Sequence, residues 1–290
     1  LKSFTVFTIL PFVALIYFSL WSATSKAEAL KSTKPELTQK APLVRLAVVN
    51  APVDTGLLAE LLPEFERESG YRVEVHKGSD AYHQARHGQA DIVISHFGKS
   101  ELQAFVQEGL GQWPVMLFSN QAVIIGPASD PAQIRDMTDA AAAVSKIAES
   151  NAKMLRNPIH GLDYLSDILR ARAGQTDSGD WFVDTGQVIK ASAIELAEKR
   201  QAYVLWGASP FLKWQKKNSS AMEILVSKDP LLQRLMAAVL VNATAQHSVN
   251  REGAKALLDF LLKPTTQARI ADYRMTGIEQ QLWWPAGRDN

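Results

Sequence analysis

The sequence predicts an α/β fold with a mostly parallel sheet and helices on both of its faces. Short apolar segments rich in β-branched residues alternate with segments whose apolar residues recur at helical spacing. Elements that alternate in this way form βαβ units, in which the connecting helices cover the sheet. The composition is that of a globular protein, because 47% of the 290 residues are hydrophobic and 21% are charged.

The N-terminal segment differs in character from the rest of the chain. Lys2 precedes an apolar run over residues 4–21, and the small residues around Ala27 fit a cleavage site. We expect residues 1–29 to be a signal peptide. The alternative is a membrane anchor at 4–21, because a run of this length is near the minimum that spans a bilayer. In either case the body of the chain is exported, after a linker at residues 30–43.

The first half of the body shows the alternation most clearly. The helix that follows residue 54 has five apolar side chains on one face, contains Pro63, which should kink it, and stops at Gly70. We expect strands at 44–49, 71–75, 91–95 and 121–126, and further helices at 81–87 and 138–150.

The second half repeats the pattern with longer helices. A polar segment at 174–180 has the composition of a loop. We expect helices at 164–172, 189–200, 251–262 and 265–273, and strands at 202–205 and 235–241.

Charge and motifs exclude several classes of protein. The chain has 31 Lys and Arg against 30 Asp and Glu, whereas nucleic-acid-binding proteins normally have a basic surplus. It has no cysteine, which excludes disulfides, thiolate metal sites and cysteine nucleophiles. It also lacks the motifs of P-loop, dinucleotide-binding, α/β-hydrolase and zinc-protease sites. We therefore expect no enzyme, no catalytic residue, no cofactor and no nucleic-acid partner.

One pair of residues has the spacing of metal ligands. His83 and His87 are four residues apart, so a helix would place both on one face. The neighbouring Gln and Arg residues are typical of a solvated helix face, and the pattern does not include the acidic residues that would complete a set of metal ligands. We expect no metal site there.

Small, hydroxyl and amide residues gather where the predicted strands end. In an open α/β sheet these positions bind ligands, because helix N-termini present free N–H groups there. The chemistry suits a small anion, with Arg156 as the cation. The alternative is that these residues are ordinary caps and turns. The segments concerned are 50–55, 78–80, 95–96, 156–161 and 185–187.

Several segments together resemble the tungstate-binding proteins of bacterial ABC importers, within the type II periplasmic binding-protein superfamily. They include VRLAVVNAPVDTGLLAELLPEFERESGYRVEV, KGSDAYHQARHGQADIVISH, VIIGPASDP, WFVDTGQ, MEILVSKDPLL and EGAKALLDFLL, and the resemblance extends over about residues 44–275. It implies two α/β lobes joined by two hinge strands, at 121–126 and 235–241. Lobe one would be 44–121 plus 241–290, and lobe two 122–240.

The resemblance also implies a binding site, in which several of the family's donors are replaced. The family's Thr/Ser loop corresponds to 48–52, where Asn50 is the polar residue that remains. Its Gly-Thr-Gly loop reads Gly78-Ser79-Asp80, its Ser-Arg-Gly segment keeps Arg156 and Gly161, and its Thr-Gly-Gln recurs at 185–187. The ligand-binding residues that we expect are Asn50, Ser79, Arg156, Asn157, His160, Thr185 and Gln187.

The replaced donors bear on which ligand is bound. A dianion taken out of water needs nearly as many donors as it had waters. The lost hydroxyls, and a carboxylate added by Asp80, argue against tight tungstate binding, although a protonated His160 would offset part of that charge. Trp206 and Tyr82 would accommodate an organic ligand. A tungstate- or molybdate-like oxyanion, a different anion and a small organic acid all stay open as ligands.

The resemblance implies the partners and the location as well. We expect a monomeric periplasmic solute-binding protein that passes a small anion to the permease of an ABC importer in the inner membrane. The alternative is a sensory or partner-binding module, periplasmic or anchored by residues 4–21, that has the same fold and has lost oxyanion binding.

Overall fold

The computed structural model describes residues 41–175, 179–188, 190–244 and 247–286. The expected signal peptide or anchor, and nearly all of the expected linker, lie outside these residues. Within the described ranges, no helix combines the length and apolar character needed to cross a membrane.

The order of the elements confirms the α/β fold. The strands are β1 (Leu43–Val48), β2 (Arg72–Lys77), β3 (Ile92–His96), β4 (Val115–Pro127), β5 (Met154–Leu155), β6 (Phe182–Val183), β7 (Tyr203–Gly207), β8 (Met222–Val226), β9 (Gln233–Leu240) and β10 (Trp284–Pro285). The helices are α1 (Asn50–Asp54), α2 (Leu57–Ser69), α3 (Ala81–Arg86), α4 (Ser100–Gln107), α5 (Ala140–Glu149), α6 (His160–Arg172), α7 (Ala191–Arg200), α8 (Ala208–Asn218), α9 (Arg251–Leu262) and α10 (Pro264–Asp272), with a 3-10 turn at Pro230–Leu232.

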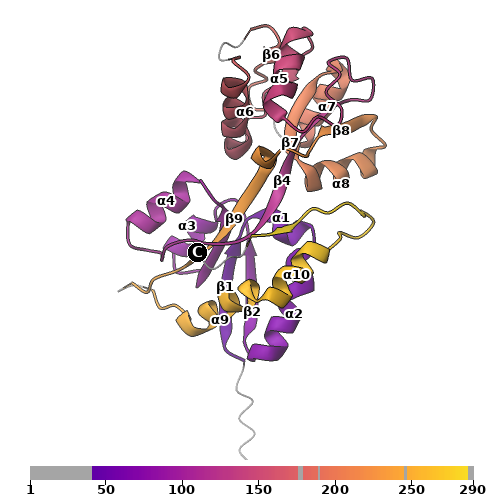
Figure 1. The fold of residues 1–290 in the computed structure, drawn as a ribbon. Helices are drawn as coiled ribbons and strands as arrows, with labels where there is room; N and C mark the ends of the chain where they lie inside the picture. The colour runs from indigo at the N-terminus through magenta and orange to yellow at the C-terminus, as the bar shows by residue number, and fades with distance from the viewer. Residues whose placement is uncertain (1–40, 176–178, 189, 245–246, 287–290) are drawn as a thin grey trace, which may run out of the picture. The chain divides into compact units, whose positions relative to one another are not determined.

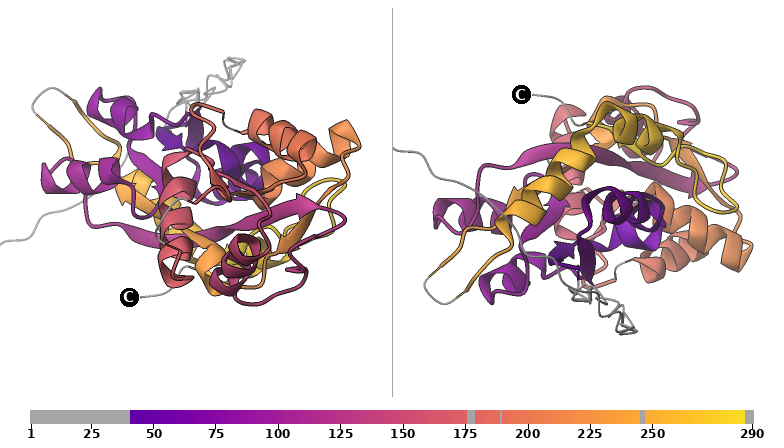
Figure 2. Two further views of the ribbon diagram at one scale, coloured as in Figure 1. Left: turned by 90° about the horizontal axis from the view of Figure 1, so that it is seen from above. Right: turned by 90° about the horizontal axis from the view of Figure 1, so that it is seen from below.

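The first sheet has the strand order β2-β1-β3-β9-β4, in which β2, β1 and β3 are parallel and the later pairs antiparallel. Alternate residues of β1 face different helix layers, because a strand turns successive side chains to opposite faces. Leu46 packs in the core cluster that contains the α2 leucines, and Ala47 in a second cluster with α3 and α4. Helix α9 lies beside α2 and α10 (Figure 2).

Strand β4 belongs to both sheets. Its first part, from Val115 to Gln121, pairs with β9, and from Ala122 onward it pairs with β7 and β8 (Figure 1). The second sheet continues with β5 and β6, which are parallel to β7. All antiparallel pairs of the described strands include β4 or β9.

The chain returns to the first sheet just before β9. Strand β9 pairs along its whole length with β3 and β4, so the return falls between Val226 and Gln233. Residues 121–126 lie where β4 passes from one sheet to the other, whereas 235–241 lie largely within the first sheet. The division into two lobes at the expected residue boundaries stays a prediction.

Local patterns predicted most elements within a few residues. Helix α9 has the expected bounds, and α2 stops at Gly70 as expected, where Gly70 caps it in a left-handed conformation. The start of α2 was wrong: Gly56 is its N-cap, because residues 50–54 form the separate helix α1. Helix α6 begins at His160 rather than 164, so the last two residues of the segment 156–161, expected as a binding loop, are helical. The expectations missed the helices α1, α4 and α8 and the strands β5, β6, β8 and β10.

A buried carboxylate ties the first sheet to the C-terminal part of the chain. Asp91 accepts hydrogen bonds from the backbone N–H groups of Arg45, at 2.7 Å, and Asn250, at 2.9 Å. It also forms an ion pair with the Arg45 guanidinium. Because Asn250 caps α9 with its side chain, this cluster fixes α9 against β1 and β3.

Candidate functional site

The loops after β1 and β2 lie next to each other at the carboxyl edge of the first sheet. Backbone hydrogen bonds from Val49 to Ile94 and from Gly78 to Val48 hold them there. Asn50 and Ser79 are both exposed at this edge. The structure therefore places these two expected residues together, as the strand-end argument predicted.

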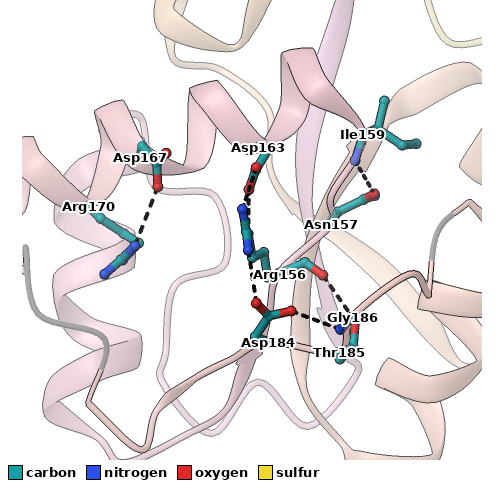
Figure 3. A network of polar contacts seen from close by, with 9 residues as sticks. All are labelled: Arg156, Asn157, Ile159, Asp163, Asp167, Arg170, Asp184, Thr185 and Gly186. Carbon is teal, nitrogen blue, oxygen red and sulfur yellow. Dashed lines mark hydrogen bonds and ion pairs between the residues drawn. The ribbon is translucent and has the colours of Figure 1, made fainter.

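Arg156 is already neutralised by two carboxylates (Figure 3). Its guanidinium donates two parallel hydrogen bonds of 2.7 Å to Asp163, and a third of 2.9 Å to Asp184. These bonds, Asp163 first, raise the pKa of Arg156 above its usual value. One guanidinium and two carboxylates leave a net negative charge around Arg156, and whether Arg156 binds the ligand stays a prediction.

The other expected residues of this region have local structural contacts. Asn157 is buried, and its side-chain NH₂ donates to the Leu205 carbonyl at 3.0 Å. Its side-chain oxygen accepts from the N–H of Ile159, the residue before α6 (Figure 3). Thr185 donates to the Arg156 carbonyl at 3.4 Å. Gln187 is exposed, and His160 is the first residue of α6. Whether any of these residues binds ligand stays a prediction.

A pocket of about 230 Å³ opens where the two sheets meet. Its wall is formed by the chain after β3, the first turns of α6 and the start of β9. Because β3 and β9 belong to the first sheet and α6 connects β5 to β6 of the second, both sheets contribute to the pocket. A single water needs about 10–15 Å³ by the same kind of measure, so the pocket has room for a larger ligand. Its lining residues are Phe97, Gly98, Lys99, Gly161, Tyr164, Leu165, Ile168, Leu231, Gln233, Arg234 and Leu235. We call this the Arg234 pocket.

Arg234 carries a half-buried positive charge into this pocket. Among the described residues, no carboxylate forms a salt bridge with it. Burial lowers the pKa of its guanidinium to about 10, so it remains charged at neutral pH. A partly buried cation without a counter-ion is costly, and such a group is typical of a site completed by a ligand.

The guanidinium of Arg234 lies directly against the backbone of Gly161. A Cβ atom built on Gly161 would come within 2.2 Å of Nη2 and 3.1 Å of Cζ of Arg234. Residue 161 therefore has to lack a side chain for Arg234 to lie where it does. Gly161 is also in the first turn of α6. Helix geometry leaves the N–H groups of His160 and Gly161 without a partner within the helix, while those of Leu162 and Asp163 donate to the Ile159 carbonyl. Guanidinium and helix N-terminus both favour an anion at this point.

His96 contributes to this region as a neutral imidazole. Burial, with the positive charge of Arg234 adding to it, lowers the pKa of His96 to about 3. Its Nε2 is 3.3 Å from the Asn120 side-chain oxygen, which accepts the hydrogen bond. On β9, Gln233 accepts a hydrogen bond of 2.9 Å from Ser119 through its side-chain oxygen, and this orients its NH₂ group as a further donor.

Other residues weighed from the sequence lie outside the pocket. The Asp80 carboxylate is exposed and accepts a hydrogen bond from Gln84, Tyr82 is buried and bonded to Ser95, and Trp206 is buried. None of the three lines the Arg234 pocket in the described part of the chain. Phe97 and Tyr164 are the aromatic residues of its wall.

Sequence reasoning missed Arg234 because it lies inside a strand rather than in a strand-end loop. A signal was present: QRLMAAVL places one arginine directly before the apolar run of this strand.

The rings of His83 and His87 are 4.2 Å apart, yet no group of three or more metal-ligating side chains occurs within the described ranges.

Comparison with known proteins identifies the family. The model of the bacterial extracellular solute-binding protein family matches residues 44–275, most of the chain. The chain belongs to this family.

The relatives of this solute-binding protein include proteins named for anions. The tungstate-binding protein TupA of Peptoclostridium acidaminophilum is 28% identical over 255 residues, which are 86% of this chain and 88% of that protein. A putative ABC transporter anion-binding protein of Haloferax volcanii is 30% identical over 246 residues, or 83% and 71% of the two chains. The structure of the tungstate-binding protein TupA from Desulfovibrio alaskensis G20 matches with a TM-score of 0.76 at 27% identity, over 86% of this chain and 100% of that one.

The two arginines of this solute-binding protein should differ in their effect on stability. Arg234→Met removes a charge that no carboxylate of the described residues compensates, so we expect it to stabilise the ligand-free protein by about 1–2 kcal/mol. In a chain of this size that is about 2–4 °C in melting temperature for each kcal/mol. The measurement is a thermal melt after dialysis into buffer without multivalent anions. Arg156→Met is the matched control and should lower the melting temperature, because Asp163 and Asp184 lose their shared partner. A loss of stability in Arg234→Met would contradict the account.

Because the pKa of His96 lies near 3, His96 stays neutral from pH 5 to 8. Its contribution to the binding of sulfate, whose charge is constant over that range, should therefore not change with pH. We expect the ratio of sulfate affinities between the wild type and His96→Gln to be the same at pH 5 and pH 8, as measured by isothermal titration. A ratio that falls as the pH rises would show that His96 titrates in this range.

Proposed function

We propose that this protein is the extracytoplasmic binding component of an ABC importer and that it holds a small anion in the Arg234 pocket. The observation that carries the proposal is Arg234, a half-buried cation without a carboxylate partner among the described residues, in a pocket that both sheets line. The family and the anion-binding relatives support the same class of ligand. The sensory alternative is not favoured, since no relative named above has that role.

The anion would be held by groups of three kinds. Arg234 supplies the charge and a planar set of N–H donors suited to a carboxylate or an oxyanion. The Gln233 amide and the first-turn N–H groups of α6 supply neutral donors. Lys99, half-buried in the same wall, adds a second positive charge.

Because the pocket draws on elements of both sheets, a bound anion would hold the two parts together. In such proteins the lobes close on the ligand by a hinge motion. The closed protein would then present the ligand to the permease. The relatives are named as binding proteins, one of them as that of an ABC transporter, so we propose binding without chemical conversion. Export to the periplasm and a monomeric state belong to this proposal as well.

Arg234→Gln should weaken anion binding about tenfold or more, because hydrogen bonds to a charged group contribute about 1.5–3 kcal/mol. The measurement is isothermal titration with tungstate, molybdate, sulfate and phosphate. Arg135→Gln is the control, since it also removes an arginine, one that is paired with Glu223 at the surface. Affinities that do not change in Arg234→Gln would show that Arg234 is not part of the site. If only a third variant, Arg156→Gln, weakened binding, the site would lie at the loops after β5 and β6 instead.

Gly161→Ala should leave the protein folded and weaken anion binding, because the new methyl group displaces the flexible end of Arg234. Gly78→Ala is a matched control: its methyl group also meets the flexible end of a side chain, that of Asp80, which does not line the pocket. Thermal melts and anion titrations of both variants make the comparison. Equal affinities in the two variants would show that the position of Arg234 does not matter for binding.

A further inference from the structure

The wall of the Arg234 pocket is mostly apolar. Six of its side chains are aromatic or aliphatic: Phe97, Tyr164, Leu165, Ile168, Leu231 and Leu235. Three of them are unusually exposed for large apolar side chains, with exposed fractions of 50% for Phe97, 66% for Tyr164 and 42% for Leu235. Of the five large apolar side chains that are exposed in the described residues, these three meet in one pocket.

The backbone holds these side chains together. The N–H of Phe97 donates to the Leu235 carbonyl at 2.8 Å, so the chain after β3 continues alongside the start of β9. Tyr164 lies one turn after Gly161 on α6, next to the point where Gly161 meets Arg234. The apolar side chains and the cation therefore belong to one continuous surface.

This surface does not suit a bare tetrahedral dianion. Such an ion is polar on all sides, and each oxygen that faces an apolar wall loses its water without gaining a donor. The charged groups that line the pocket are Lys99 and Arg234, while most of the remaining wall offers contacts to carbon. Pockets that are largely apolar, with a few convergent polar groups, bind organic molecules and orient them by those groups.

We propose that the ligand is a small organic monoanion, with a carboxylate or sulfonate head and an aromatic or branched apolar body. This inference rests on the proposed function, because it uses the same pocket and the same cation. The head would accept hydrogen bonds from Arg234, Gln233 and the N–H groups at the start of α6. The body would pack against Phe97, Tyr164 and Leu235, which then lose their exposure to water.

The test compares anions that share a head and differ in the body. The probes are benzoate against acetate, and benzenesulfonate against methanesulfonate, with tungstate and sulfate as inorganic anions, all titrated into the purified protein. We expect each aromatic anion to bind at least tenfold more tightly than its methyl counterpart and than either inorganic anion. The two aromatic probes also show which head is preferred.

Two variants separate the roles of the body and the head. Tyr164→Ser should weaken benzoate and benzenesulfonate severalfold and leave acetate and sulfate unchanged, because it removes contact area and no charge. Trp113→Ser is the control, an aromatic side chain that is 81% exposed and lies outside the pocket. Arg234→Gln should weaken every anion. Melting curves of all variants confirm that they are folded.

The outcomes distinguish this inference from the proposed function. Tungstate or sulfate that binds as tightly as the aromatic anions, with no effect of Tyr164→Ser, would overturn the inference and leave an anion-binding protein. Aromatic anions that bind equally well to Arg234→Gln, or no binding of any anion, would overturn the proposed function as well.

Discussion

The continuity of β4 is the constraint on which the rest of the structure depends. One strand pairs with β9 before Gln121 and with β7 and β8 after it, so both sheets are fixed to the same segment of backbone. The chain returns at the start of β9, beside β4. Because of this arrangement, the end of β3, the start of α6 and the start of β9 meet in one place, and the Arg234 pocket forms there.

The two arginines differ in whether the fold supplies a carboxylate partner for their charge. Arg156 has two carboxylate partners, so its charge is satisfied within the fold. Arg234 gains no such partner among the described residues, and burial lowers its pKa. Burying an uncompensated charge destabilises the folded protein. An anion that binds at Arg234 stabilises it, because a ligand that binds only the folded state shifts the folding equilibrium toward that state. The neutral state of His96 nearby results mainly from its burial, to which the positive charge of Arg234 adds.

Local sequence patterns predicted much of the fold and less of the site. Amphipathic spacing predicted α9 to the residue, and short apolar runs rich in β-branched residues predicted β1 and β3, since both signals lie within a few neighbours. The site depends on contacts between distant segments. Asp184 pairs with Arg156 across 28 residues of sequence, and Gly161 of helix α6 contacts Arg234 of β9, which belongs to the other sheet. Neither contact therefore has a local sequence signal. The segments that carry Asn50 and Ser79 do lie at one edge, because strand ends of a parallel sheet meet there, and their part in binding stays a prediction.

The most direct test is a crystal structure of the protein with 4-bromobenzenesulfonate, located by the anomalous signal of its bromine. The account predicts a sulfonate within about 2.7–3.2 Å of the Arg234 guanidinium, and the bromine among Phe97, Tyr164 and Leu235. A sulfonate bound instead to Asn50, Ser79 and Arg156, with the Arg234 pocket filled by water, would contradict it.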